Sequence, residues 1–138
     1  MSFNKQKWFW LGLGGVVLFD QISKAVIERW WQTNLIINDG ISFGLKFGSN
    51  HLQTMILLLL WLVMAWILLI QLRFKSLYIG IFLGGGISNL IDRLIWGGVR
   101  DWLSWPIIPI SNNLADWAIA IGLVGFGIRC LDKTSVAV

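Results

Sequence analysis

Residues 55–70 read MILLLLWLVMAWILLI, a run without one charged side chain. The wider segment Leu52–Leu72 is long enough to cross about 30 Å of hydrocarbon, because a transmembrane helix needs about 20 residues. The whole chain is 57% hydrophobic and 13% charged, whereas soluble domains are about 25% charged. A soluble fold of 138 residues could not bury so much apolar surface. The sequence therefore predicts an integral membrane protein.

Three further apolar segments have a similar length but carry polar residues at one end: Trp8–Ile27, Leu77–Trp96 and Asn113–Arg129. We therefore expect a mainly α, four-transmembrane-helix bundle, with spans at about 8–27, 52–72, 77–96 and 113–129. No internal repeat is visible, so residues 1–138 are expected to form a single membrane-embedded domain. Within the first segment, the short apolar run that ends at Phe19 is followed by Asp20-Gln21 and not by a small-residue cleavage site, which argues against a cleaved signal peptide.

Basic residues fall on one side of this four-span topology: Lys5, Lys7, Arg73, Lys75, Arg129 and Lys133. That side holds a single acid, Asp132, whereas the other six acids fall towards the opposite side. Because cytoplasmic loops are rich in Lys and Arg, we expect both termini in the cytoplasm and the acids at the outer face. The ten Trp residues agree with a membrane location, because Trp favours membrane interfaces.

The two outer loops are expected to differ. Residues 34–48 predict a small β-hairpin on the membrane surface, because Asn38-Asp39-Gly40 lies between two apolar runs and Asp-Gly is a strong turn signal. Residues 97–112 contain Pro106 and Pro109, so this loop is not expected to be a continuous helix.

Ionisable residues within membrane spans are costly and are therefore candidate functional residues. Asp20 and Lys24 are spaced i, i+4, which favours an ion pair of structural or functional importance. Asn89, Asp92 and Arg93 share one helix face and are expected to point into the bundle, where they form a polar group that orients other side chains. The preceding Gly84-Gly85-Gly86 allows close helix approach.

Two acids are expected to meet at the outer side. Asp116 and Asn113 begin the fourth segment, where either capping or chemistry would suit them, and Asp101 follows the third segment, with 14 residues between the two acids. Two neighbouring carboxyl groups share one proton and titrate as a unit. The ionised group can then activate water, while the protonated one donates to an amide. Either Asp could be the base.

The sequence offers little for other chemistries. His51 is the only histidine and Cys130 the only cysteine, so neither a nucleophile–histidine pair nor a metal-ligand pattern is evident. No metal or cofactor is expected. The net charge of +4 is dispersed, without the basic patch that nucleic-acid binding requires.

Five segments together resemble the lipoprotein signal peptidase (type II signal peptidase) family. DQISK at 20–24 matches its D-Q-x-[ST]-K, NDGISF at 38–43 its N-x-G-x-[AS]-F, and GGISNLIDR at 85–93 its G-G-x-x-N-x-x-D-R. VRDW at 99–102 resembles V-x-D-F, and NLAD at 113–116 matches N-x-A-D. Each motif alone is weak, but five in order on a four-span frame are very specific.

The resemblance implies an aspartic membrane endopeptidase with Asp101 and Asp116 as the catalytic pair. Its substrate would be a prolipoprotein with a diacylglyceryl-modified cysteine, cut just before that cysteine. The protein would act as a monomer among the lipids of the bacterial cytoplasmic (inner) membrane, with the outer ribbon cradling the substrate. Matching positions that bind or orient substrate are Asn38, Asn89, Arg93 and Asn113; those with structural roles are Asp20, Lys24, Gly40 and Asp92.

Departures from the family pattern are Ser88, Trp102, Asn112 and the short loop between the two acids, which bear on the shape of the substrate pocket. Two other functions suit buried acids beside an Arg. A proton- or ion-handling membrane protein would show proton flux without proteolysis. A membrane adaptor for lipidated proteins would bind its partner and never cut it.

Overall fold

The computed structural model describes residues 3–40, 48–71, 76–104 and 111–135. This part contains four long helices: α1 (Phe3–Trp30), α2 (Asn50–Trp66), α3 (Leu77–Trp96) and α4 (Leu114–Ser135). A 3-10 turn, η1 (Gln32–Asn34), follows α1, and a π-helical turn, η2 (Ile67–Gln71), continues α2. The predicted third segment, 77–96, is confirmed at both ends. Helix α1 is longer than the predicted 8–27, because hydropathy marks only the apolar part of a helix.

Within the described residues, the helical stretches long and apolar enough to cross a membrane are three: Gln6–Trp30, Asn50–Ile70 and Leu77–Trp96. Helix α4 is not among them, so the predicted fourth crossing stays a prediction. Large exposed side chains cover these helices, as lipid-facing surfaces require. They include Trp8 and Trp10 near the start of α1 and Trp30 and Trp31 at its other end. This spacing suits two membrane–water interfaces.

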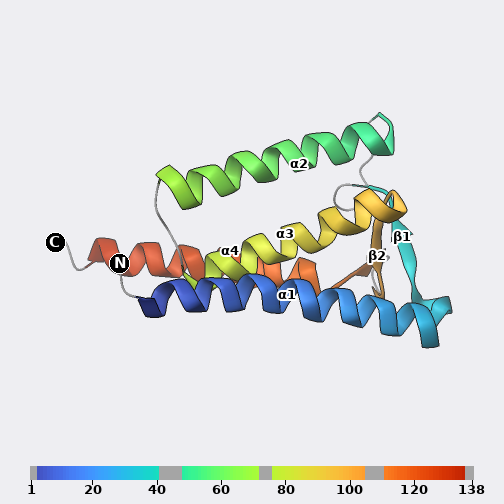
Figure 1. Cartoon of the computed structure of the whole chain (residues 1–138), viewed down its shortest axis with the longest axis horizontal. Helices are drawn as coiled ribbons and strands as arrows, with labels where there is room; N and C mark the ends of the chain where they lie inside the picture. Colours follow the sequence, from blue (N-terminus) through green and yellow to red (C-terminus); the bar gives the residue numbers. More distant parts are fainter. Residues whose placement is uncertain (1–2, 41–47, 72–75, 105–110, 136–138) are drawn as a thin grey trace.

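Helix α3 packs between α1 and α4, while α2 lies to one side of the other three helices (Figure 1). Three consecutive glycines of α3 each face a different neighbour. A Cβ on Gly84 would lie 2.6 Å from the Leu13 carbonyl oxygen of α1, and one on Gly85 would lie 2.5 Å from that of Ala115 in α4. A Cβ on Gly86 would lie 2.5 Å from the Trp61 ring of α2. The prediction that these glycines allow close helix approach is confirmed.

Gly85→Ala is expected to destabilise the protein. The added methyl group would meet the Ala115 carbonyl, which is backbone, so α3 and α4 would have to separate; overpacking of this kind costs about 1–3 kcal/mol. Thermal unfolding of the purified protein would measure the loss. The matched control is Gly127→Ala in α4, where nothing lies within 4 Å of the new Cβ. Equal unfolding temperatures for the two variants would contradict the packing.

In the part of the chain that the structure describes, four short strands form two pairs beyond the helix ends. Strand β1 (Ile36–Asn38) pairs antiparallel with β2 (Val99–Asp101), and β3 (Leu103–Ser104) pairs antiparallel with β4 (Ser111–Asn112). Figure 1 shows β1 and β2 at one end of the bundle, away from both termini. The strands at Val99–Asp101 and Leu103–Ser104 show that the loop after α3 is not a continuous helix, as predicted.

The hairpin prediction for residues 34–48 stays a prediction, but β1 has a described partner that the sequence did not predict. The described partner of β1 is β2, with Ile36 opposite Asp101 and Asn38 opposite Val99. The predicted second strand, residues 41–47, lies outside the described residues. A local turn signal such as Asp39-Gly40 does not reveal a strand that lies far along the chain, which is why the sequence missed this pairing.

Candidate active site

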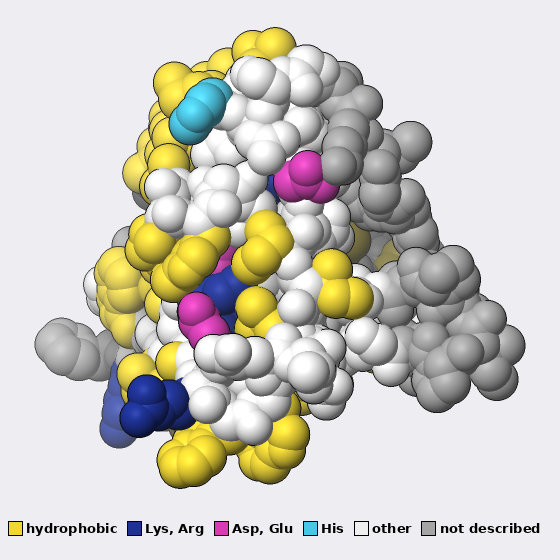
Figure 2. Space-filling view, turned by 90° about the vertical axis from the view of Figure 1, so that its right-hand side faces the viewer, with side chains coloured by type: hydrophobic (Ala, Val, Ile, Leu, Met, Phe, Trp, Pro, Cys, Tyr) yellow, Lys and Arg dark blue, Asp and Glu magenta, His cyan; other side chains and the backbone are white. Residues whose placement is uncertain are grey.

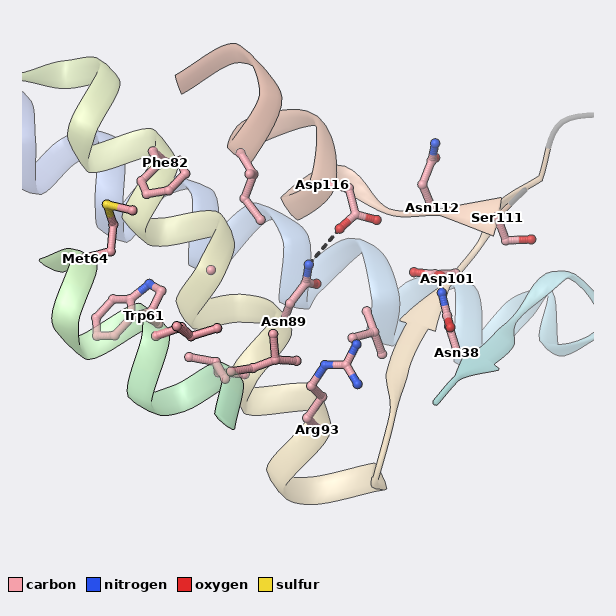
Figure 3. A pocket seen from close by; sticks show the side chains of 16 residues that line it. Asn38, Trp61, Met64, Phe82, Asn89, Arg93, Asp101, Ser111, Asn112 and Asp116 are labelled. Carbon is pink, nitrogen blue, oxygen red and sulfur yellow. Dashed lines mark hydrogen bonds between the residues drawn. The ribbon is translucent and has the colours of Figure 1, made fainter. Parts of the chain in front are cut away.

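A cavity of about 610 Å³ lies beside α3 and reaches the strand end of the bundle. Nine apolar residues line much of it: Leu57, Leu60, Trp61, Met64, Phe82, Gly86, Leu90, Val99 and Ile119. Seven polar residues complete the lining: Asn38, Asn89, Arg93, Asp101, Ser111, Asn112 and Asp116. In Figure 3, Trp61, Met64 and Phe82 lie towards one end and the two aspartates towards the other. The cavity therefore offers a long apolar wall that ends at two carboxyl groups.

Asp101 is held by two carboxamides. Its side chain is 1% exposed, Asn38 Nδ2 donates to its Oδ2 at 2.9 Å, and Asn113 Nδ2 donates to its Oδ1 at 2.7 Å. The β1–β2 register places Asn38 beside it, because Asn38 lies opposite Val99 and side chains two residues apart share a face. The strand pairing therefore brings these two distant segments together.

Burial raises the pKa of the Asp101 carboxyl to about 6. The hydrogen bonds from Asn38 and Asn113 act in the opposite direction, since they stabilise the ionised form, and the nearby charge of Asp116 raises the pKa further. A carboxyl group with a pKa near 6 can exchange its proton close to neutral pH, as a general acid or base must.

Asp116 lies in the first turn of α4. Asn89 Nδ2 donates to its Oδ1 at 2.7 Å (Figure 3), and the backbone N–H of Asn113 donates to its Oδ2 at 3.2 Å. The Asn113 side chain caps the helix in return, because the Asp116 N–H donates to Asn113 Oδ1 at 3.0 Å. Asn113 thus contacts both acids, and both acids line one cavity.

A buried ion cluster braces this site. Lys24 is fully buried, and its Nζ lies 2.6 Å from Asp20 Oδ2 and 2.9 Å from Asp92 Oδ2. The predicted Asp20–Lys24 pair is therefore confirmed, with Asp92 as a second partner. Lys24 also donates to Asn89 Oδ1 at 3.2 Å, so it orients the carboxamide that binds Asp116.

The two carboxylates of the cluster anchor the backbone just before each candidate acid. The N–H of Ala115, which precedes Asp116, donates to Asp20 Oδ1 at 2.9 Å. The N–H of Arg100, which precedes Asp101, donates to Asp92 Oδ2 at 3.0 Å. Because Lys24 contacts both carboxylates, one buried amine links the two acid-bearing segments.

Asn89, Asp92 and Arg93 each contact other groups around the site, as the sequence predicts, and Lys24 joins the first two. Asn89 contacts Asp116 and Asp92 contacts Lys24, whereas Arg93 donates through Nη2 to the Gly40 carbonyl and lines the cavity. The Gly40 N–H donates to Asn38 Oδ1 at 3.1 Å, which holds the turn after β1. Arg93 and Gly40 thus help to position Asn38 beside Asp101.

Sequence reasoning missed a second set of buried contacts around Arg100. Gln21 donates to Ser88 Oγ and Asp92 Oδ1, and Ser88 Oγ donates to Asp20 Oδ2 at 2.7 Å. Arg100 donates to Asp92, Gln21 and Glu28. Alternation along a short strand through Asp101 could have indicated that Arg100 faces the opposite side.

The described residues contain no group of three His, Cys, Asp or Glu that could hold a metal ion. Seen from the strand end of the bundle, Figure 2 shows acidic and basic side chains near the centre of the face, with hydrophobic side chains around them and along one margin. His51, the one histidine in the sequence, lies in the first turn of α2.

Comparisons with known proteins show which family the chain resembles. Residues 13–131 match the signal peptidase (SPase) II family. A lipoprotein signal peptidase of Burkholderia ambifaria is 34% identical, with 83% of this chain and 82% of the relative aligned. One of Burkholderia mallei is 31% identical over the same shares.

Two solved structures share the fold. A bacterial membrane enzyme at 2.3 Å resolution superimposes with a TM-score of 0.71 and 24% identity, over 91% of this chain and 88% of the other. A second, at 1.9 Å resolution, gives a TM-score of 0.70 and 24% identity, over 88% and 90%. The family match spans most of the chain, and it includes all five motifs that the sequence shares with lipoprotein signal peptidases. The chain belongs to the signal peptidase II family.

Proposed function

We propose that the protein is an aspartic endopeptidase that cuts the signal peptide from diacylglyceryl-modified prolipoproteins, just N-terminal to the lipidated cysteine. The observation that carries this proposal is the cavity itself. Two carboxyl groups, that of buried Asp101 and that of half-buried Asp116, line one end of a mostly apolar cavity. An apolar wall suits acyl chains and an apolar signal segment. A substrate bound along this wall would place its scissile peptide bond beside the two acids.

In the proposed reaction the two acids share one proton. The ionised acid takes a proton from water, whose oxygen attacks the amide carbon, while the protonated acid donates to the carbonyl oxygen and later to the leaving nitrogen. Asn38 and Asn113 orient Asp101, and Asn89 orients Asp116. Arg93 lines the cavity close to both acids and would orient a substrate carbonyl.

The proposed location is the bacterial cytoplasmic membrane, crossed four times by a monomer. Lys5 and Lys7 lie in the first two turns of α1, before its apolar stretch, which favours a cytoplasmic N-terminus. The strand end, which carries Asp101, would then lie near the outer face of the membrane. Helix α4 would cross back, so both termini would lie in the cytoplasm. Both ends of the chain lie at the same end of the bundle in Figure 1, which agrees with this topology.

The direct test uses purified protein in lipid vesicles and a synthetic precursor peptide whose cysteine carries an S-diacylglyceryl group. Mass spectrometry should detect two products, with the new N-terminus at the lipidated cysteine. The same peptide without the lipid is the matched control and should be cut poorly. An intact lipidated peptide after long incubation with folded protein would refute the proposal.

Asn38→Ala is expected to change the pH dependence of cleavage. The hydrogen bond from Asn38 stabilises the ionised form of Asp101. Its loss should therefore raise the pKa of Asp101 above about 6. The limb of the pH–rate profile that belongs to Asp101 should therefore move to higher pH. A shifted acidic limb would make Asp101 the base, and a shifted alkaline limb would make it the acid. The control is Asn34→Ala in η1; unchanged limbs in both variants would contradict the assignment.

A further inference from the structure

Arg100 is an unusually well-bound arginine next to a candidate catalytic residue. It is 2% exposed and directly precedes Asp101 in β2. Since side chains alternate along a strand, Arg100 points away from the face on which Asp101 meets Asn38. It therefore cannot reach a substrate at the cavity, and its effect on Asp101 must pass through the backbone of β2.

The guanidinium of Arg100 joins this strand to two helices. Its Nη2 donates to Asp92 Oδ1 of α3 at 2.8 Å and to Gln21 Oε1 of α1 at 2.8 Å. Its Nη1 donates to Glu28 Oε2 of α1 at 2.9 Å. Gln21 and Glu28 are seven residues apart, so they lie on one face of α1. The planar guanidinium group presents several N–H donors in a fixed arrangement, which a lysine amine does not reproduce.

Two further contacts fix the plane and the backbone. The Arg100 guanidinium carbon lies 3.7 Å from the centre of the Trp96 ring, a stacking geometry. The Arg100 N–H donates to Asp92 Oδ2, so one carboxylate holds both the backbone and the side chain of the same residue. The contacts of Arg100 thus hold β2 in place at the residue before Asp101, while the Asp101 side chain faces the cavity.

The geometry points to Arg100 as a positioning residue that sets the place of the Asp101 carboxyl relative to Asp116. This inference rests on the proposed peptidase function. A displacement of about 1 Å at a reacting group can cost about 100-fold in rate. Loosening the strand should therefore lower kcat while leaving the apolar wall, and with it KM, nearly unchanged.

The test is Arg100→Lys, which keeps the charge but loses the fork. Per folded molecule, kcat should fall by about 10- to 100-fold, with KM close to that of the wild type. Asp101 should also lose part of its contact with Asn38 and Asn113, so its limb of the pH–rate profile should move to higher pH. A merely structural role would lower the yield of folded enzyme but leave kcat per folded molecule and the pH profile unchanged, and that result would overturn the inference.

The matched control is Arg29→Lys, an exposed arginine in the last turn of α1, which should behave like the wild type. If Arg100→Lys does not fold, Trp96→Ala decides, because it removes only the stacking partner. A reduced kcat that Trp96→Phe restores would support the inference, and a wild-type kcat and pH profile in Trp96→Ala would overturn it. Absence of cleavage by the wild type would instead refute the proposed function itself.

Discussion

Asp101→Asn and Asp116→Asn should each abolish processing of a lipidated precursor, with a loss of about a thousandfold or more. General acid–base catalysis contributes about 10²–10⁴-fold to a rate, and an amide can neither accept a proton from water nor donate one to the leaving nitrogen. Because the two acids act as one unit in the proposed mechanism, the double variant should be about as inactive as either single variant. Cleavage of the lipidated peptide, followed by mass spectrometry, is the measurement.

The matched control for this pair is Asp132→Asn, the same chemical change near the other end of α4. It should process the precursor normally. Both active-site variants should remain folded, since asparagine has nearly the same size as aspartate. Normal processing by a folded Asp101→Asn or Asp116→Asn protein would show that the dyad is not the catalytic unit.

Lys24→Met should destabilise the protein more than any other single change considered. Asp20, Lys24 and Asp92 are all 1% exposed or less. Removal of the Lys24 amine would leave the buried carboxylates of Asp20 and Asp92 without the positive charge that they both contact. Breaking a buried ion pair in this way costs about 3–5 kcal/mol. The cluster also anchors the residues before Asp101 and Asp116, so activity should fall together with stability. Thermal unfolding in detergent or lipid would measure the loss.

Lys7→Met removes the same group from an exposed position on α1 and should leave the unfolding temperature nearly unchanged. Adding Asp20→Asn to Lys24→Met removes one of the two stranded charges and should recover part of the stability. An unfolding temperature for Lys24→Met equal to that of Lys7→Met would contradict the structural role of the cluster.

Much of the helical frame was predictable because hydropathy and capping signals are local. The hydropathy of residues 77–96 alone marks this helix. At its start the Ser76 side chain accepts a hydrogen bond from the Ile79 N–H, and Gly97 ends the helix with φ 74°. The i, i+4 spacing of Asp20 and Lys24 likewise gives their contact directly. The shared cavity of Asp101 and Asp116 followed from helix ends that lie on one side.

The sequence could not reveal contacts that depend on how distant segments align. The pairing of Ile36 with Asp101 depends on where α1 and α3 end relative to each other. The same holds for Arg100, whose partners Gln21 and Glu28 lie more than seventy residues away. The sequence motif identifies Asp101, but only the packing of the helices shows which side chains Arg100 binds.

The three glycines that face three different helices make α3 sensitive to its own length. One residue inserted between Gly86 and Asn89 would rotate everything beyond it by about 100°, since an α-helix has 3.6 residues per turn. The Asn89 carboxamide would then turn away from Asp116 while each glycine kept its neighbour. The rotational phase between the packing positions and the polar ones is thus as important as the residues themselves, and changes in chain length should be tolerated only outside this helix.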